Sequence, residues 1–130
     1  MIEFKNLTKR FPGGKIAVDS LNLTFNDGEF IVFIGTSGSG KTTSMRMINR
    51  MIEPTSGEIL INGKNSKDMN AVELRRQIGY VIQQIGLMPH MTIFDNIVMV
   101  TKLLKWPVEK QRKIAEELIQ KVDLPLEFLE

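Results

Sequence analysis

The sequence predicts an α/β fold, and three observations support that prediction. Two stretches near the amino terminus, 2–7 and 17–25, alternate apolar and polar residues as half-buried strands do. An unbroken apolar run, 30–34, has the composition of a strand that is buried on both faces. The glycine-rich segment 35–42 follows, and after it the sequence becomes helical in character. We therefore expect a small antiparallel sheet that leads into a central strand, a loop and a helix.

Composition places the chain among ordinary globular proteins. Its 130 residues allow one domain at most, and 42% hydrophobic residues suffice for a core. The net charge of +2 comes without a polybasic run, so charge indicates neither nucleic acid nor a membrane surface as a partner. The absence of cysteine excludes disulfides and thiolate metal sites. The amino terminus lacks the apolar stretch of a signal peptide, and we expect a cytosolic protein that can still dock on a membrane protein.

The segment GTSGSGKT, residues 35–42, matches the Walker A pattern. Its glycines permit positive φ, and its N–H groups are expected to form an anion nest at the positive end of the helix dipole. Lys41 can reach terminal phosphates, and the Thr42 hydroxyl is placed to ligate Mg²⁺. A glycine-rich turn that binds nothing is disfavoured by the strand–loop–helix context. The predicted nucleotide-binding residues of this loop are Gly35, Thr36, Ser37, Gly38, Ser39, Gly40, Lys41, Thr42 and Thr43.

Beyond the loop, periodicity predicts a helix over 43–51, a strand over 58–61, a helix over 70–77 and a buried strand over 78–82. The first helix is expected to fill the core with Met45, Ile48, Met51 and Ile52. Asn70 is the expected N-cap of the second helix, and Glu73 completes an approximate capping box. The turn pair Asn62-Gly63 closes the short strand.

From Thr92 onward the pattern is helical, with Thr92 as the expected N-cap and Asp95 at the third helical position. Pro107 suits the first turn of a second helix, and 123–130 is expected to be a loop. The residues expected to face inward are Ile93, Ile97, Val100, Leu103, Leu104, Ile114, Leu118, Ile119 and Val122.

The stretch GTSGSGKTTSMRMINRMIEPTSGEILING resembles the ATP-binding subunit of ATP-binding-cassette (ABC) transporters. In that family a Pro-Thr-Ser-Gly turn and a short strand follow the Walker helix, and 54–61 has this form. Residues 78–97, IGYVIQQIGLMPHMTIFDNI, resemble the family's Q-loop. Phe11, 24 positions before Gly35, occupies the place of the aromatic residue that stacks on adenine. The segments RMINRMIEPTSG and YVIQQIGLMPHMTIFDNI are most similar to the ATP-binding subunits of importers of glycine betaine, carnitine and choline.

The resemblance implies roles for single residues. Gln83 matches the Q-loop glutamine, whose carbonyl ligates Mg²⁺ or orients the attacking water, and Gln84 is the competing register. Lys41 and Gln83 are thus the predicted catalytic residues, and Thr42 and Gln83 the predicted metal ligands. Phe11 either stacks on adenine or packs on the small sheet.

Three other residues near these motifs invite a functional interpretation. Val18 is expected in the core, with a place beside the adenine pocket as the alternative. His90 does not match the family's switch histidine, which follows the Walker B strand, and is expected to have a structural role. Met88 stands where many relatives have phenylalanine, in the loop expected to contact the transmembrane subunit.

The resemblance also implies an organisation: an antiparallel β-subdomain over 1–29, a Walker A core with the Q-loop over 30–91, and the beginning of a helical subdomain over 92–130. Its implied cofactors are ATP and Mg²⁺. Its implied partners are transmembrane permease subunits, through them a substrate-binding protein, and a second ATPase copy in a head-to-tail dimer, with no nucleic acid. The implied location is the cytoplasmic face of the cell membrane.

Two motifs that the family needs for hydrolysis do not occur in these 130 residues: an LSGGQ-like signature and an apolar run ending in Asp-Glu, the Walker B pattern. We expect the chain to be the amino-terminal part of a longer ATPase that alone binds nucleotide weakly and hydrolyses ATP negligibly. A non-catalytic regulatory nucleotide-binding module is the alternative. An ABC-type DNA-repair ATPase is disfavoured because no long coiled coil begins after the Q-loop, and a GTPase because Asn-Lys-x-Asp is absent.

Overall fold

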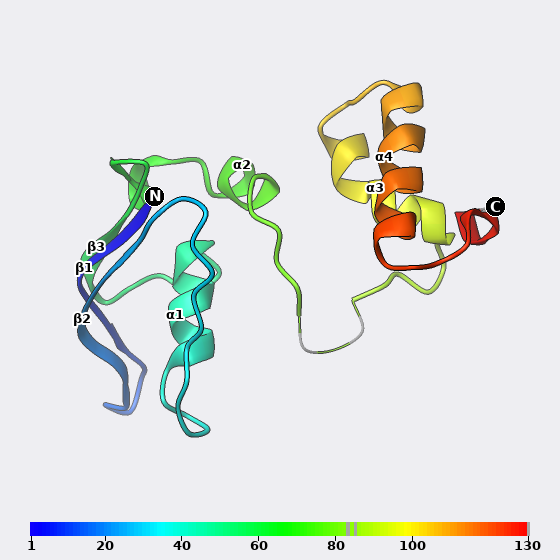
Figure 1. Ribbon diagram of the computed structural model, residues 1–130. Helices are drawn as coiled ribbons and strands as arrows, with labels where there is room; N and C mark the ends of the chain where they lie inside the picture. The colour runs from blue at the N-terminus through cyan, green and yellow to red at the C-terminus, as the bar shows by residue number, and fades with distance from the viewer. Residues whose placement is uncertain (83, 85, 130) are drawn as a thin grey trace. The chain divides into compact units, whose positions relative to one another are not determined.

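The computed structural model describes residues 1–82, 84 and 86–129 and divides into two compact units, Met1–Gly79 and Tyr80–Glu130. The first unit contains an antiparallel sheet, the glycine-rich loop and two α-helices, and the second contains two α-helices and a 3₁₀ helix (Figure 1). The finer division into 1–29, 30–91 and 92–130 stays a prediction.

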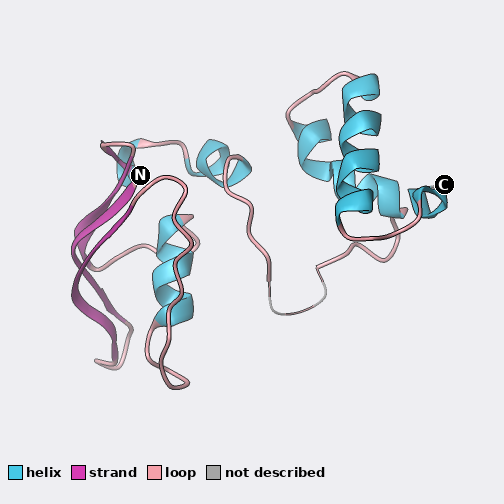
Figure 2. Ribbon diagram, viewed as in Figure 1, coloured by secondary structure: helices cyan, strands magenta, loops and turns pink. Residues whose placement is uncertain are grey.

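The alternating stretches near the amino terminus form the sheet of the first unit. Its strands are β1 (Ile2–Arg10), β2 (Ile16–Phe25), β3 (Ser56–Ile61) and β4 (Lys64–Asn65), in the order β2-β1-β3-β4 with every neighbour antiparallel. The longer strands of this sheet are drawn in magenta in Figure 2. The Asn62-Gly63 turn that joins β3 to β4 has positive φ at both positions, as a tight hairpin requires. These three longer strands and this turn confirm the predictions made from the alternation.

A bulge in β1 decides which of its residues reach the core. The register with β2 shifts between Phe4 and Leu7, and Asn6 has a φ of 48°. The extra residue places Phe4 and Leu7, three positions apart, on the same buried face. Asn6 is held by Asn22, because each donates to the other's side-chain oxygen, at 2.8 and 3.0 Å.

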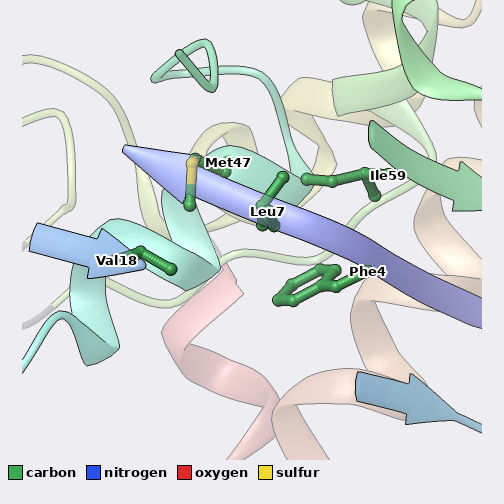
Figure 3. Packing of buried hydrophobic residues seen from close by; sticks show 5 residues of the cluster. All are labelled: Phe4, Leu7, Val18, Met47 and Ile59. Atoms are coloured by element: carbon green, nitrogen blue, oxygen red, sulfur yellow. The ribbon is translucent and has the colours of Figure 1, made fainter. Parts of the chain in front are cut away.

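The core of the first unit lies between the sheet and helix α1 (Lys41–Ile48). Met47 from α1 packs with Phe4, Leu7, Val18 and Ile59 from the strands (Figure 3). Ile48 and Ile52 pack partly buried against this cluster, whereas Met45 and Met51 are about half exposed. The prediction that both methionines fill the core is therefore wrong, because α1 is short and places only one stripe of side chains on the sheet.

The strands predicted over 30–34 and 78–82 do not form within the described residues. Both segments are irregular, and Phe30, Ile34 and Val81 are 93%, 93% and 94% exposed. Phe33 is the partly buried member of the first segment, with its ring 6.0 Å from that of Phe25. A strand needs a hydrogen-bonding neighbour, and no described segment pairs with either stretch. The apolar composition was therefore misleading about local structure.

Two arginines join the end of α1 to the elements that follow it. Arg75 of α2 (Ala71–Arg76) donates to the carbonyls of Asn49 and Arg50, at 3.0 and 2.6 Å. Arg50, in a left-handed conformation with a φ of 55°, donates from Nη1 to the carbonyls of Ser66 and Met69, at 3.1 and 2.8 Å. Together these bonds connect the turn after α1 to α2 and to the segment around Ser66 and Met69.

The N-cap of α2 is the one predicted from the sequence. The Asn70 side-chain oxygen accepts from the backbone N–H groups of Val72 and Glu73, at 2.9 and 3.1 Å. These bonds satisfy two of the donors that the first turn leaves free.

The second unit packs α3 (Ile93–Leu103) and α4 (Val108–Lys121) with a 3₁₀ helix, Leu126–Leu129, where a loop was predicted. Its buried cluster is Val98, Ala115, Ile119 and Leu129. The residues predicted to face inward but found exposed are Ile93, Val100, Leu103, Leu104, Leu118 and Val122. The apolar stripes are wider than the contact between two helices, so much of each stripe meets solvent.

The predicted cap of α3 is confirmed, because the Thr92 hydroxyl oxygen accepts from the N–H of Asp95 at 3.0 Å. In the described part of the chain, no helix has the length and apolar character needed to cross a membrane.

Candidate functional site

A cavity of about 440 Å³ lies between the hairpin of β1 and β2 and the glycine-rich loop at the start of α1. The hairpin contributes Phe11, Pro12, Lys15 and Ala17. The loop and the helix contribute Ser37, Gly38, Ser39, Gly40, Lys41, Thr42 and Thr43. The cavity therefore combines one aromatic ring, two lysines and a run of backbone amides.

The hairpin tip fixes the position of Phe11. The Phe11 N–H donates to the Lys15 carbonyl at 2.9 Å, and the Gly14 N–H donates to the Phe11 carbonyl at 3.1 Å. Gly13 and Gly14 have φ values of 88° and 83°, which L side chains rarely adopt. The Pro-Gly-Gly turn thus closes tightly and places Lys15 across from Phe11.

Lys41 forms hydrogen bonds to three other residues of the glycine-rich loop. Its ammonium group donates to the carbonyls of Gly35 and Thr36, at 2.7 and 2.8 Å, and to the Ser39 hydroxyl at 3.2 Å. The loop is equally tight at Gly35, where an added Cβ would lie 2.7 Å from Ser39 Oγ. The lysine therefore holds both ends of the loop together while it remains at the cavity wall.

Gly40 allows the hairpin and the loop to approach one another. It is the N-cap of α1 with a φ of 91°, and an added Cβ would lie 2.2 Å from the Ala17 carbonyl oxygen. A distance below 3.0 Å cannot be accommodated without a backbone shift. Glycine is thus required here for both conformation and space.

The start of α1 is suited to a negatively charged ligand. No side chain caps the helix at Gly40, and its first turn contains no acidic residue. The unpaired N–H groups of the first turn, together with the helix dipole, favour an anion. Lys15 and Lys41 add two positive charges to the same cavity.

Sequence comparison assigns the chain to a family. The family model described as ABC transporter matches residues 18–127. The chain belongs to the ABC transporter family.

Two ABC transport proteins illustrate the similarity. The carnitine transport ATP-binding protein OpuCA of Listeria monocytogenes is 61% identical over all of this chain, which covers 33% of that protein. The glycine betaine/carnitine/choline transport ATP-binding protein OpuCA of Bacillus subtilis is 57% identical over all of this chain, which covers 34% of that protein. The chain thus spans about a third of the length of these relatives. The predicted resemblance to osmoprotectant importers is confirmed.

A solved ABC structure confirms the fold class. The ATP-binding cassette MJ0796, determined as a dimer in a post-hydrolysis state with ADP and Pi, matches with a TM-score of 0.85 at 34% identity. The match covers 99% of this chain and 60% of that one. The fold is therefore that of part of an ABC cassette.

Most of the residues predicted to bind nucleotide line the same cavity. Phe11 shares the cavity with residues 37–43, whereas Gly35 and Thr36 contribute carbonyls to Lys41 rather than cavity wall. Gln83 lies outside the described residues. Val18 is buried in the core, as expected, rather than in the cavity.

Two exposed residues of the second unit, Gln84 and His90, were weighed in the sequence. Within the described residues neither side chain forms a hydrogen bond or an ion pair, and the structural role of His90 stays a prediction.

Sequence reasoning missed three residues of the cavity: Pro12, Lys15 and Ala17. Lys15 follows Phe11 by four positions, across a Pro-Gly-Gly turn, and that spacing is the signal that could have placed it beside the ring.

Proposed function

We propose that this chain binds ATP in the 440 Å³ cavity, as part of the ATP-binding subunit of an importer for a quaternary amine osmoprotectant such as glycine betaine, carnitine or choline. The observation that supports binding most strongly is the combination of the Lys41-closed loop with Phe11 in one cavity. The volume lies within the range of about 300–1,000 Å³ found for small-molecule sites.

The two sides of the cavity suit the two ends of ATP. Phe11 offers an aromatic face to adenine, and stacking of this kind contributes about 1–3 kcal/mol per base. The amides at the start of α1 and the Lys41 ammonium face the triphosphate. Lys41 uses its three N–H donors on the carbonyls of Gly35 and Thr36 and on the Ser39 hydroxyl, so phosphate binding would exchange at least one of these hydrogen bonds for one to phosphate.

Mg²⁺ would be held by the Thr42 hydroxyl and, as the sequence predicts, by Gln83. No cluster of three His, Cys, Asp or Glu that could bind a metal occurs in the part of the chain that the structure describes. The Thr42 hydroxyl and the Gln83 side chain fit Mg²⁺, which typically uses few protein ligands and takes the rest from phosphates and water. The ion would neutralise phosphate charge, while Gln83 would orient the attacking water.

The names of the relatives support the proposed solute class and partners. Proteins 57–61% identical over the whole chain are ATP-binding proteins of carnitine, choline and glycine betaine transport. We infer a head-to-tail dimer of ATPase subunits that acts on permease subunits, and through them on a substrate-binding protein, at the cytoplasmic face of the membrane. The missing signature and Walker B motifs lead us to expect negligible hydrolysis by these 130 residues alone.

The test is a titration of a fluorescent ATP analogue into the chain and its Lys41→Ala variant. Loss of charge-assisted hydrogen bonds to phosphate should weaken binding by about tenfold or more. Lys64→Ala, which removes an exposed lysine on β4, is the matched control and should bind normally. Equal affinity of the Lys41→Ala variant and the unchanged chain would refute the proposal.

The companion measurement is phosphate release from ATP at steady state. Release by the 130-residue chain at the rate of full-length relatives would contradict the expected lack of hydrolysis.

A further inference from the structure

Lys9 lies against the aromatic ring at the cavity but is not part of the cavity wall. Its Nζ is 5.2 Å from the centroid of the Phe11 ring, within the distance of a cation–π interaction. Phe11 lines the cavity and Lys9 does not. The Phe11 ring therefore contacts the Lys9 ammonium group, while Phe11 also lines the cavity.

The sheet register explains why a lysine reaches this position. Lys9 is paired with Val18 across β1 and β2, and paired residues project from the same face of a sheet. Val18 belongs to the buried cluster, so the aliphatic stem of the half-buried Lys9 lies on the core side of the sheet. Its charged head then extends beyond the core toward the segment that follows α1.

That segment holds the ammonium group in place. Lys9 Nζ donates to the Glu53 carbonyl at 2.8 Å. Two residues later the chain is bonded to β1, because the Thr55 N–H donates to the Thr8 carbonyl at 2.8 Å and the Arg10 N–H donates to Thr55 Oγ1 at 2.9 Å. The acceptor of Lys9 is thus part of a fixed backbone rather than a mobile side chain.

We propose that Lys9 is a positioning residue that fixes the Phe11 ring so that its cavity face can stack on the nucleobase. The inference rests on the proposed function, because it assigns Lys9 a part in ATP binding without a contact to ATP. A cation–π contact of this kind at a partly exposed site corresponds to about a two- to fivefold change in affinity.

A purely structural role for Lys9 makes a different prediction. If Lys9 only joined β1 to the Glu53 segment, its loss would disturb the whole cavity, including the phosphate end. The loss of Lys9 would then weaken binding by the same factor whether or not position 11 carries an aromatic ring. A probe without a base and a background without the ring therefore separate the two roles.

The experiment measures binding of ATP and of inorganic tripolyphosphate by calorimetry to the 130-residue chain and to Lys9→Met, Phe11→Leu and the double variant. Methionine keeps the apolar stem and removes the charge. We expect Lys9→Met to weaken ATP about two- to fivefold, to leave tripolyphosphate unchanged, and to have no further effect in the Phe11→Leu background. Lys9→Arg, which retains a cation, should bind ATP almost normally.

Three results would overturn the inference: unchanged ATP affinity in Lys9→Met, equal weakening of both ligands, or the same loss in the Phe11→Leu background. Any of these leaves the proposed function standing if Lys41→Ala still weakens ATP binding by about tenfold or more. If the unchanged chain binds neither ATP nor tripolyphosphate, the proposed function is refuted, and so is the role of Lys9 that rests on it.

Discussion

Strand β1 and the apolar segment 30–34 belong to the same unit but meet solvent very differently. β1 is hydrogen-bonded along both edges, to β2 and to β3, and its Phe4 and Leu7 are buried. The segment 30–34 has no strand partner among the described residues, and Phe30 and Ile34 are almost fully exposed. The difference shows that an apolar sequence is not enough to bury a segment. The segment also needs neighbouring strands with which its backbone can form hydrogen bonds.

The largest expected effect tests this difference directly. Leu7→Ala removes a side chain that is 0% exposed and should lower the free energy of unfolding by about 2–5 kcal/mol. Ile34→Ala removes a similar apolar group from the exposed segment and should change it by about 0.5 kcal/mol or less. Urea denaturation of both variants, followed by circular dichroism, gives the two values.

Equal destabilisation by the two substitutions would show that 30–34 is buried in solution. The comparison between the two regions would then have to be abandoned.

A second, smaller effect tests how tightly the paired strands approach. Gly57 in β3 has a φ of 79°, and an added Cβ would lie 2.3 Å from the Asn6 carbonyl oxygen. Gly63 has almost the same φ, 77°, with nothing within 4 Å. Gly57→Ala should therefore cost more than Gly63→Ala, which carries only the backbone strain of about 1–3 kcal/mol.

Thermal unfolding of the two glycine variants provides the comparison. A Tm for Gly57→Ala equal to or above that of Gly63→Ala would mean that the β1–β3 contact is looser than the structure shows.

The smallest effect concerns the start of α3, which needs no neighbouring strand. Hydrogen bonds from the Lys102 ammonium, and then from Thr92, lower the pKa of the Asp95 carboxyl below its ordinary value of 3.8. A lowered carboxyl pKa contributes stability above the unfolded-state value, and this is lost as the pH falls through the folded-state value. The chain should therefore exceed Asp95→Asn in stability at neutral pH, by a small margin because the pair is exposed.

Unfolding measured from pH 7 to pH 2 checks this. The margin between the chain and its Asp95→Asn variant should begin to shrink as the pH falls toward 3.8 and should be lost only below the lower folded-state pKa; a margin that grows on acidification would contradict the assignment.

Features that depend on a few adjacent residues could be predicted from the sequence. The caps at Asn70 and Thr92 and the Asn62-Gly63 turn are of this kind, and so is the glycine-rich loop with Lys41. Each depends on bonds within about one turn of chain, so local chemistry suffices to specify it.

Features that depend on distant segments could not be predicted in the same way. The strands over 30–34 and 78–82 required partners that the described residues do not supply. The position of Lys9 beside Phe11 depends on the register of β1 with β2, which shifts at three places that the alternation does not reveal. The position of Lys15 depends on how the hairpin turn closes. The resemblance located Phe11 only because a family pattern already contains that long-range information.

Helix α1 begins at the glycine-rich loop, and the turn that follows its last residue carries Arg50 and is bonded by Arg75. The Arg75 guanidinium connects the carbonyls of Asn49 and Arg50, just after α1, to α2. The Arg50 guanidinium connects the same turn to the carbonyls of Ser66 and Met69. A displacement of α1 would therefore have to carry α2 with it or break these arginine bonds, which would leave several backbone acceptors without their donors.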